Sequence, residues 1–297
     1  MVVVDFDDDV TRRHIWKLIS FAIPEPRQGS RTMRRFLFCF IQALAVFPLC
    51  LVAQDTQKTS IKTDPQAVQM LELVIQRMGG SPISGIADVK IEGNLRSPAA
   101  PDEILGSFVA KARGEDWAIQ AVHGGRTTEQ RVLGGAGTSF DGSASEALHS
   151  LITSGTRLDI FPLFQRWTEF DQHGSYASVV GTAAIDGVAC AQIHVHSGTT
   201  KPDPRTFNQH GDIDVFIDAG TGLVLAVRYK AMLGMPTPHP VEVEAHFAKY
   251  EKMGGILTPT LITRYVFGQP RVVFQVTAVQ INNGFSDEDF RAHGGKR

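Results

Sequence analysis

The chain has few cysteines, three in 297 residues. Two of them, Cys39 and Cys50, lie in one apolar run near the N-terminus, so a chain cleaved after that run keeps only Cys190. A single cysteine cannot form an internal disulfide, and stability must therefore come from a packed core.

The chain also lacks an excess of charge of either sign, because 29 basic and 31 acidic residues leave a formal net charge of -2. Nucleic-acid-binding domains usually carry a basic excess, so no nucleic-acid partner is expected. The hydrophobic share of 43% and the charged share of 20% are those of an ordinary globular protein.

Long apolar runs are absent except for one, which follows Met33-Arg34-Arg35 and extends from Phe36 to Ala53. Two arginines, an apolar run and a small residue before a polar start are typical of a secretory signal peptide. The alternative is an uncleaved anchor, since about eighteen apolar residues can just span a bilayer. Pro48 and Ala53 favour cleavage near Ala53, which predicts a periplasmic or otherwise exported protein that is not integral to the membrane.

This interpretation divides the chain into three parts. Residues 1–32 are expected to be a wrongly assigned or non-functional extension, because Met33 suits the start of the signal. Residues 33–53 are the predicted signal peptide. Residues 54–297 contain no linker or repeat and are expected to form a single domain.

The clearest element of that domain is a helix that begins at Asp64-Pro65 and ends at Gly79-Gly80. The side chain of Thr63 or Asp64 can accept the first free N–H groups, proline suits the first turn, and glycine ends the helix. Apolar residues recur at helical spacing and predict one packed face: Val68, Leu71, Ile75 and Met78.

Most of the remaining chain alternates between apolar and polar residues and predicts strands. We expect strands over 86–95, 104–112, 116–122, 128–133, 177–185, 188–196, 212–218, 223–232, 240–250, 260–267 and 272–282. The connections are too short for crossover helices, so pairing should be antiparallel. Short helices are expected over 143–154 and 158–170. The predicted fold is α+β: a strongly curved antiparallel sheet of about 11 strands, with an N-terminal helix and two inserted helices covering its concave face.

A polar cluster is predicted where the strand 188–196 precedes the strand 212–218. Residues two apart on a strand share a face, so the hairpin would place His194, His196, Asp212 and Asp214 on one side. These are metal-ligand types, and a metal-dependent hydrolase is one interpretation. The simpler interpretation, which we favour, is the solvent-facing side of a half-buried sheet.

No other sequence pattern predicts catalysis. Cys190 lies in an apolar strand, Gly134-Gly135-Ala136-Gly137 lacks the lysine of a phosphate loop, and no Gly-x-Ser-x-Gly motif occurs. We therefore expect no enzyme and no cofactor.

Two motifs give the chain a resemblance to a known family. Asp218-Ala219-Gly220-Thr221-Gly222-Leu223 resembles a "D-x-x-T-G-L" hairpin, and Phe247 to Pro259 resembles "F-x-x-Y-x-x-x-x-G-I-x-x-P". With the opening helix and a closing strand before Asn282-Asn283 and Asp289-Phe290, they resemble the outer-membrane lipoprotein-sorting family of LolA and LolB. The resemblance spans about residues 64–290 and implies a half-open β-barrel whose concave apolar face, covered by helices, receives acyl chains.

The predicted function is therefore that of an exported, non-catalytic protein that binds lipid or lipoprotein acyl chains on the concave face. The expected wall is Ile193, Val195, Ile213, Val215 and Ile217; the expected cover is Leu71, Ile75, Leu163, Phe164 and Trp167. An alternative is a periplasmic sensor or scaffold domain with a filled interior, for which an envelope protein would be the partner.

Overall fold

The structure is a computed structural model that describes residues 63–80, 83, 85–148, 160, 175–196, 212–231 and 240–291. The extension 1–32 and the signal peptide 33–53 predicted from the sequence lie outside these residues. So do the loop 197–211 and, apart from Ile160, the predicted helix 158–170.

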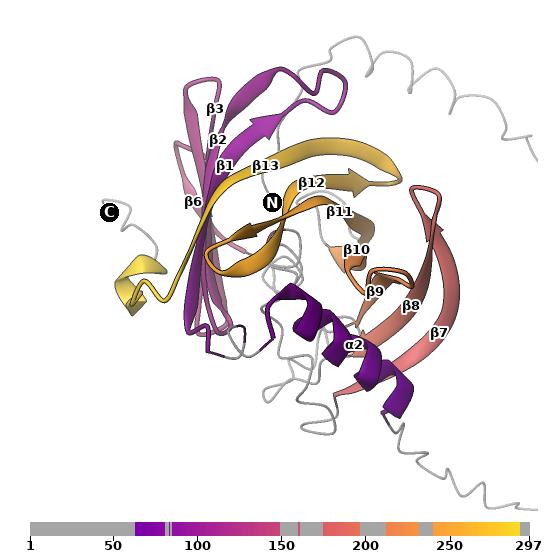
Figure 1. Ribbon diagram of the computed structural model, residues 1–297. Coiled ribbons are helices and arrows are strands. Elements are labelled where there is room, and N and C mark those ends of the chain that lie inside the picture. Colours follow the sequence, from indigo (N-terminus) through magenta and orange to yellow (C-terminus); the bar gives the residue numbers. More distant parts are fainter. Residues whose placement is uncertain are drawn as a thin grey trace, which may run out of the picture. The chain divides into compact units, whose positions relative to one another are not determined.

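One antiparallel sheet of 13 strands forms the body of the described chain (Figure 1). Its strands are β1 (Asp88–Arg96), β2 (Ile104–Arg113), β3 (Asp116–His123), β4 (Arg126–Leu133), β5 (Ala136–Phe140), β6 (Ser145–Ala147), β7 (Tyr176–Ile185), β8 (Val188–His196), β9 (Asp212–Asp218), β10 (Val224–Ala231), β11 (Val241–Met253), β12 (Ile256–Val266) and β13 (Gln269–Ile281). The sheet is not closed, because β6 and β7 each pair with one strand only. A curved antiparallel sheet was predicted correctly, and the count of about 11 strands was wrong.

The order of the strands is β6-β5-β4-β3-β2-β1-β13-β12-β11-β10-β9-β8-β7. From β1 to β6, each strand pairs with the one before it, so β6 forms one edge of the sheet. From β7 to β13 the same holds, so β7 forms the other edge, and β13 pairs with β1 at the centre. Leu95 lies opposite Phe274, and Val89 lies opposite Ile281 in this central pair. Ile160, which lies between β6 and β7 in the sequence, is buried in the core.

The two additional strands, β5 and β6, lie in a segment for which the sequence predicted no strand, and β6 falls within the predicted helix 143–154. Gly134 and Gly135 have φ of +59° and +83° and make the turn between β4 and β5, so only glycine fits both positions without strain. The helix predicted over 143–154 is wrong where the structure describes it, because Ser145–Ala147 is the edge strand β6. A five-residue strand with a glycine, followed by a three-residue strand, has too little apolar alternation to predict.

The helix α2 (Pro65–Met78) has the ends that the sequence predicted. The Asp64 carboxylate accepts a hydrogen bond from the Gln66 N–H at 2.9 Å, and Gly80, with φ of +63°, donates to the Ile75 carbonyl at 2.9 Å. Its buried face is rotated slightly from the predicted one and consists of Ala67, Leu71, Val74 and Met78. No helix in the described ranges is both long and apolar enough to span a membrane.

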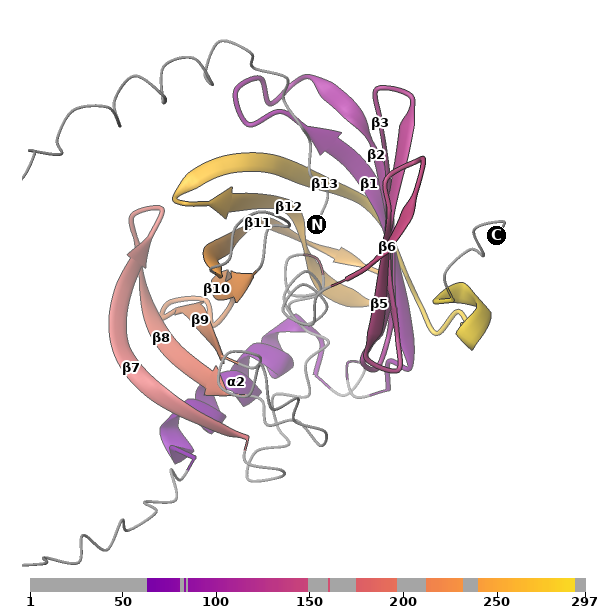
Figure 2. The same ribbon diagram turned by 180° about the vertical axis from the view of Figure 1, so that it is seen from behind.

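The sheet curves around one continuous apolar core, and α2 lies on its concave side (Figures 1 and 2). The helix packs mainly on β7 and β12, and the backbone N–H of Asp64 donates to the Ala177 carbonyl of β7 at 2.8 Å. The convex side carries a second, much smaller cluster of Ile185, Cys190, Phe216 and Ala226. The concave side is therefore the main hydrophobic surface of the sheet.

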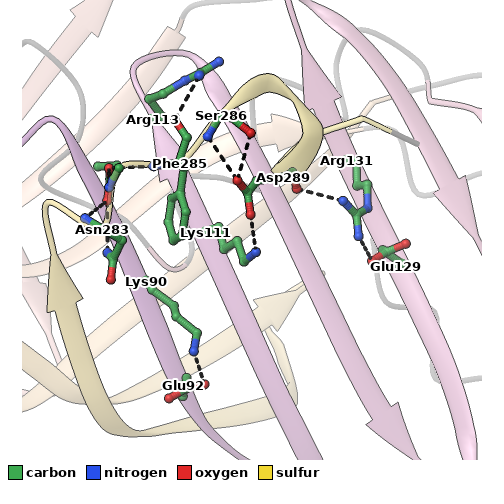
Figure 3. A network of polar contacts seen from close by, with 12 residues as sticks. Lys90, Glu92, Lys111, Arg113, Glu129, Arg131, Asn283, Phe285, Ser286 and Asp289 are labelled. Carbon is green, nitrogen blue, oxygen red and sulfur yellow. Dashed lines mark hydrogen bonds and ion pairs between the residues drawn. The ribbon is translucent and has the colours of Figure 1, made fainter. Parts of the chain in front are cut away.

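The chain after β13 folds back onto the convex side of β1–β4 (Figure 3). Lys111 and Arg113 of β2 form ion pairs with Asp289 and Asp287, at 2.8 Å and 2.6 Å. Phe290 is only 1% exposed beneath them. These contacts tie the end of the described chain to its first strands.

Asp88, the first residue of β1, fixes the turn that begins this return. Its carboxylate accepts hydrogen bonds from the backbone N–H groups of Asn283 at 2.6 Å, Gly284 at 2.7 Å and Phe285 at 3.1 Å. The side-chain amide of Asn283 donates a fourth at 3.0 Å. Burial alone would raise the pKa of Asp88, but these hydrogen bonds to the ionised form lower it below its ordinary value.

Candidate functional site

The predicted hairpin of β8 and β9 forms, and it divides polar from apolar side chains as expected. Ile193 lies opposite Val215 and Val195 lies opposite Ile213. These four and Ile217 are all buried in the core on the concave side. The predicted wall residues therefore share one face of the sheet.

The apolar face continues well beyond this hairpin. Every strand from β1 to β4 and from β10 to β13 contributes buried residues to the same core cluster. They include Ile91, Phe108, Trp117, Val132, Val227, Val243, Phe247, Ile262 and Phe274. The sequence analysis named wall residues on two strands only, and the core cluster extends beyond those two strands.

The predicted cover residues fall into two groups. Leu71 is fully buried on α2, whereas Ile75 is only half-buried at the edge of the packed face. Leu163, Phe164 and Trp167 lie outside the described residues. Among the described residues, α2 is the only helix of more than one turn on the concave face.

The two sequence motifs of the resemblance meet beside α2. The hydroxyl of Tyr250 donates to the Val224 carbonyl at 2.5 Å, directly after the turn of the first motif. Within that turn Thr221 donates to the Asp218 carboxylate at 2.6 Å. Gly222 has φ of +72°, and a Cβ there would lie 3.3 Å from Leu73 of α2. The turn of the first motif therefore lies against α2, and the absence of a side chain at Gly222 leaves room for Leu73.

A charged residue on the concave face was missed by the sequence analysis. Arg264 of β12 is only 5% exposed, although it is an arginine. It lies opposite Ala245 in the β11–β12 pair and between Ile262 and Val266 along its strand, and all three belong to the core cluster. Alternation within the predicted strand 260–267 was the available signal, since it assigns Arg264 to the apolar side.

The polar side of the β8–β9 hairpin is on the convex face. The Nδ1 atom of His194 lies 2.9 Å from Asp214, and its Nε2 atom lies 3.5 Å from Asp212. His196 Nδ1 lies 2.6 Å from Asp212. Hydrogen bonds to Asp212 and Asp214 favour the protonated ring and raise the pKa of His194 to about 9. The same contacts lower the pKa of Asp212 to about 2.

This face has a shallow hollow of about 200 Å³, lined by His194, Asp212, Ile213, Asp214, Arg228, Tyr229, Lys230 and Glu242. Positive and negative groups alternate across it, as they do in an ion-paired sheet surface. Both ring nitrogens of His194 face carboxylates, which favours an imidazolium, and an imidazolium cannot ligate a metal. No group of three or more potential metal ligands with suitable geometry occurs in the part of the chain that the structure describes.

Cys190 does not have the surroundings of a reactive thiol. It is 1% exposed in the small convex cluster, and burial raises its pKa. A thiol held in its neutral form is a poor nucleophile.

The sequence matches no model of a known protein family, and it matches no curated protein. Solved structures do match. A DUF1329 family protein from Desulfovibrio piger has 17% identity and a TM-score of 0.46, with 77% of this chain and 98% of that chain covered. A LolA superfamily protein from Nitrosomonas europaea has 10% identity and a TM-score of 0.48, with 76% and 97% covered.

A putative outer-membrane lipoprotein-sorting protein domain from Vibrio parahaemolyticus has 10% identity and a TM-score of 0.44, with 76% and 96% of the two chains covered. Two of these three structures therefore carry the name of the family that the sequence motifs resemble.

Proposed function

We propose that the concave face of the sheet binds acyl chains of lipids or lipoproteins, and that the protein is an exported binding protein rather than an enzyme. The observation that carries this proposal is the mismatch between the apolar face and its helix. Thirteen strands at about 4.8 Å spacing give an arc of roughly 58 Å. The 14 residues of α2 form a helix about 21 Å long and roughly 10 Å wide. Among the elements that the structure describes, α2 is the only helix of more than one turn on this face, and a helix of this size covers only part of it.

The proposed binding wall is the β8–β9 set, Ile193, Val195, Ile213, Val215 and Ile217. The proposed cover is Leu71, Ile75, Leu163, Phe164 and Trp167. An acyl chain on this wall would gain about 0.8 kcal/mol for each CH₂ group removed from water. A cover that moves aside would let a chain enter and then exclude water from it.

The cellular setting of the proposal comes from the sequence. The predicted signal peptide would deliver the chain to the periplasm or another exported compartment, where lipids and lipoproteins are available as ligands. The resemblance of the two motifs to the LolA and LolB family agrees with such a role. An envelope protein that delivers or receives the lipid would be the second partner.

Trp117 offers a direct test because it lies fully buried on the concave face of β3. In a variant with Trp16 and Trp167 replaced by phenylalanine, a brominated fatty acid should quench the fluorescence of Trp117. The same fatty acid without bromine should not. A matched control moves the tryptophan to the convex side of the same strand, by Trp117→Phe with Val122→Trp, because Val122 is 40% exposed.

Binding on the concave face predicts quenching at position 117 and none at position 122. Native mass spectrometry of the protein from its own envelope should also show lipid adducts. An unquenched Trp117 together with the bare chain mass would refute acyl-chain binding and favour a scaffold with a filled interior.

A further inference from the structure

Gln130 of β4 places an uncharged polar group in the apolar core of the concave face. Its side chain is 3% exposed, and its carbonyl oxygen Oε1 is buried without a hydrogen-bond partner in the part of the chain that the structure describes. Ile119 lies opposite Gln130 on β3, and Val132 follows it on the same face of β4. A buried acceptor without a partner has lost its hydrogen bonds to water and gained none in return, which destabilises the folded protein.

A second polar side chain lies on the same face, at the end of β3. Residues two apart on a strand share a face, so His123 faces the same side as Trp117 and Ala121, which are buried in the core. Both ring nitrogens of His123 are buried, and neither has a hydrogen-bond partner among the described residues. The arm formed by β3 and β4 therefore holds unused hydrogen-bonding groups at two places on an otherwise apolar surface. Gln130 is the more deeply buried of the two.

The chemistry of the Gln130 carbonyl specifies the group that would complete it. Ser139 of β5 lies directly opposite Gln130, and yet Oε1 accepts no hydrogen bond from it. Buried polar atoms in folded proteins nearly always have a partner, and an exception calls for a bound group that supplies one. A carbonyl oxygen only accepts, so the bound group must donate from O–H or N–H. An ionised carboxylate has no such donor and does not fit.

We propose that Gln130 binds the hydrogen-bond-donating end of an uncharged amphiphile whose acyl chain lies on the concave face. This inference rests on the proposed function and adds the ligand class: lipids with a free hydroxyl or amide N–H group next to the acyl chain, in preference to lipids without one. Ile119 and Val132 contact the adjoining methylene groups of such a ligand. Hydroxyl and amide share the required donor, and the experiment below separates them.

The test measures quenching of Trp117 by brominated ligands of equal chain length, in the protein that has Trp117 as its one tryptophan. Trp117 lies opposite Val132, the next residue of β4 on the same face as Gln130. One ligand pair is a fatty alcohol and its methyl ether, and the other is an N-methyl fatty amide and its N,N-dimethyl counterpart. The donor-bearing member of at least one pair should bind about fivefold more tightly, as expected for one neutral hydrogen bond. The pair that shows the difference identifies the donor.

Variants assign the difference to Gln130. Gln130→Met keeps the length of the side chain and removes the acceptor, so it should weaken binding of the donor-bearing ligand about fivefold without weakening that of its methylated counterpart. Gln120→Met is the matched control, because Gln120 is exposed on the opposite face of β3. His123→Leu is a control on the same face, because His123 lies four residues beyond Ile119, roughly 13 Å along the strand. Both controls should keep the preference.

The delipidated protein supplies a measurement that does not depend on a ligand. An acceptor without a partner destabilises the folded state, so Gln130→Met should leave the midpoint of urea unfolding unchanged or raise it. A lower midpoint would overturn the inference, because it would show that the amide stabilises the fold itself.

Equal affinity for the two members of both ligand pairs would also overturn the inference and leave acyl-chain binding intact. Equal weakening of both members by Gln130→Met would do the same, because that result indicates a change of packing rather than a lost hydrogen bond. If none of the four ligands quenches Trp117, the proposed function itself fails.

Discussion

Replacing Asp88 with alanine should destabilise the protein by about 3 kcal/mol. The carboxylate accepts four hydrogen bonds, three from consecutive backbone N–H groups of Asn283–Phe285 and one from the Asn283 side chain. A hydrogen bond to a charged group contributes about 1.5–3 kcal/mol, but donors near the surface can bind water after the change, which reduces the sum. The estimate corresponds to one or two bonds lost without replacement.

Urea unfolding followed by circular dichroism would measure this loss of stability. Hydrogen exchange should show faster exchange at 283–285, because the turn loses its acceptor. Asp141→Ala is the matched control: its carboxylate also accepts several hydrogen bonds, from Ser143 and Ala144, but within one exposed turn. A change of unfolding free energy for Asp88→Ala no larger than that for Asp141→Ala would refute the argument that Asp88 secures the returning chain.

The pH dependence gives a second measure of the same contact. Because the folded pKa of Asp88 is lowered, its stabilisation is present above the ordinary aspartate pKa of about 3.9 and is lost as pH falls through the lower folded value. When the pH is lowered from about 4, the free energy of unfolding should therefore fall more for the wild-type protein than for Asp88→Ala. Parallel curves for the two proteins would contradict the assignment.

Further predictions concern three other sites. Leu71→Ala should cost about 3 kcal/mol in urea unfolding because Leu71 is fully buried, whereas Leu73→Ala, at 40% exposure on the same helix, should cost about 1 kcal/mol or less; equal losses would contradict the assigned helix face. Cys190 should be alkylated by iodoacetamide only after denaturation, as checked by peptide mass spectrometry, and rapid labelling of the native protein would refute its burial. NMR titration should give His194 a pKa of about 9, so its stabilising contribution is complete below about pH 6.5 and is lost as pH rises through about 9. Asp212→Asn should lower the pKa of His194. An unchanged pKa would show that the contact with Asp212 does not cause the raised value.

The parts of the fold that local chemistry controls were predictable. Asp64, Pro65 and Gly80 define the ends of α2 by hydrogen bonding and backbone conformation, which the sequence shows directly. The alternation in β8 and β9 likewise predicted that His194 would face Asp214 and that Ile193 would pack inward, because the period of a strand is fixed.

The parts that depend on distant segments were not predictable. The contact of Asp88 with Asn283 joins residues 195 positions apart, and no local pattern at either residue indicates the other. Arg264 was overlooked for a related reason: its type suggests solvent, and only the assignment of its whole strand to the concave side overrides that preference. Strand β6 is too short for a period to be recognised.

The strand order has a consequence for how the protein is assembled. The edges of the sheet, β6 and β7, come from the middle of the sequence, whereas its centre joins the first strand to the last. During synthesis β1 therefore has no partner on one side until β13 has been made, and this edge stays open until almost the whole described domain is complete. Contacts so distant in sequence form slowly, and an unpaired central strand can bind other chains. A truncation that removes β13 would leave two incomplete sheets rather than a shorter version of one.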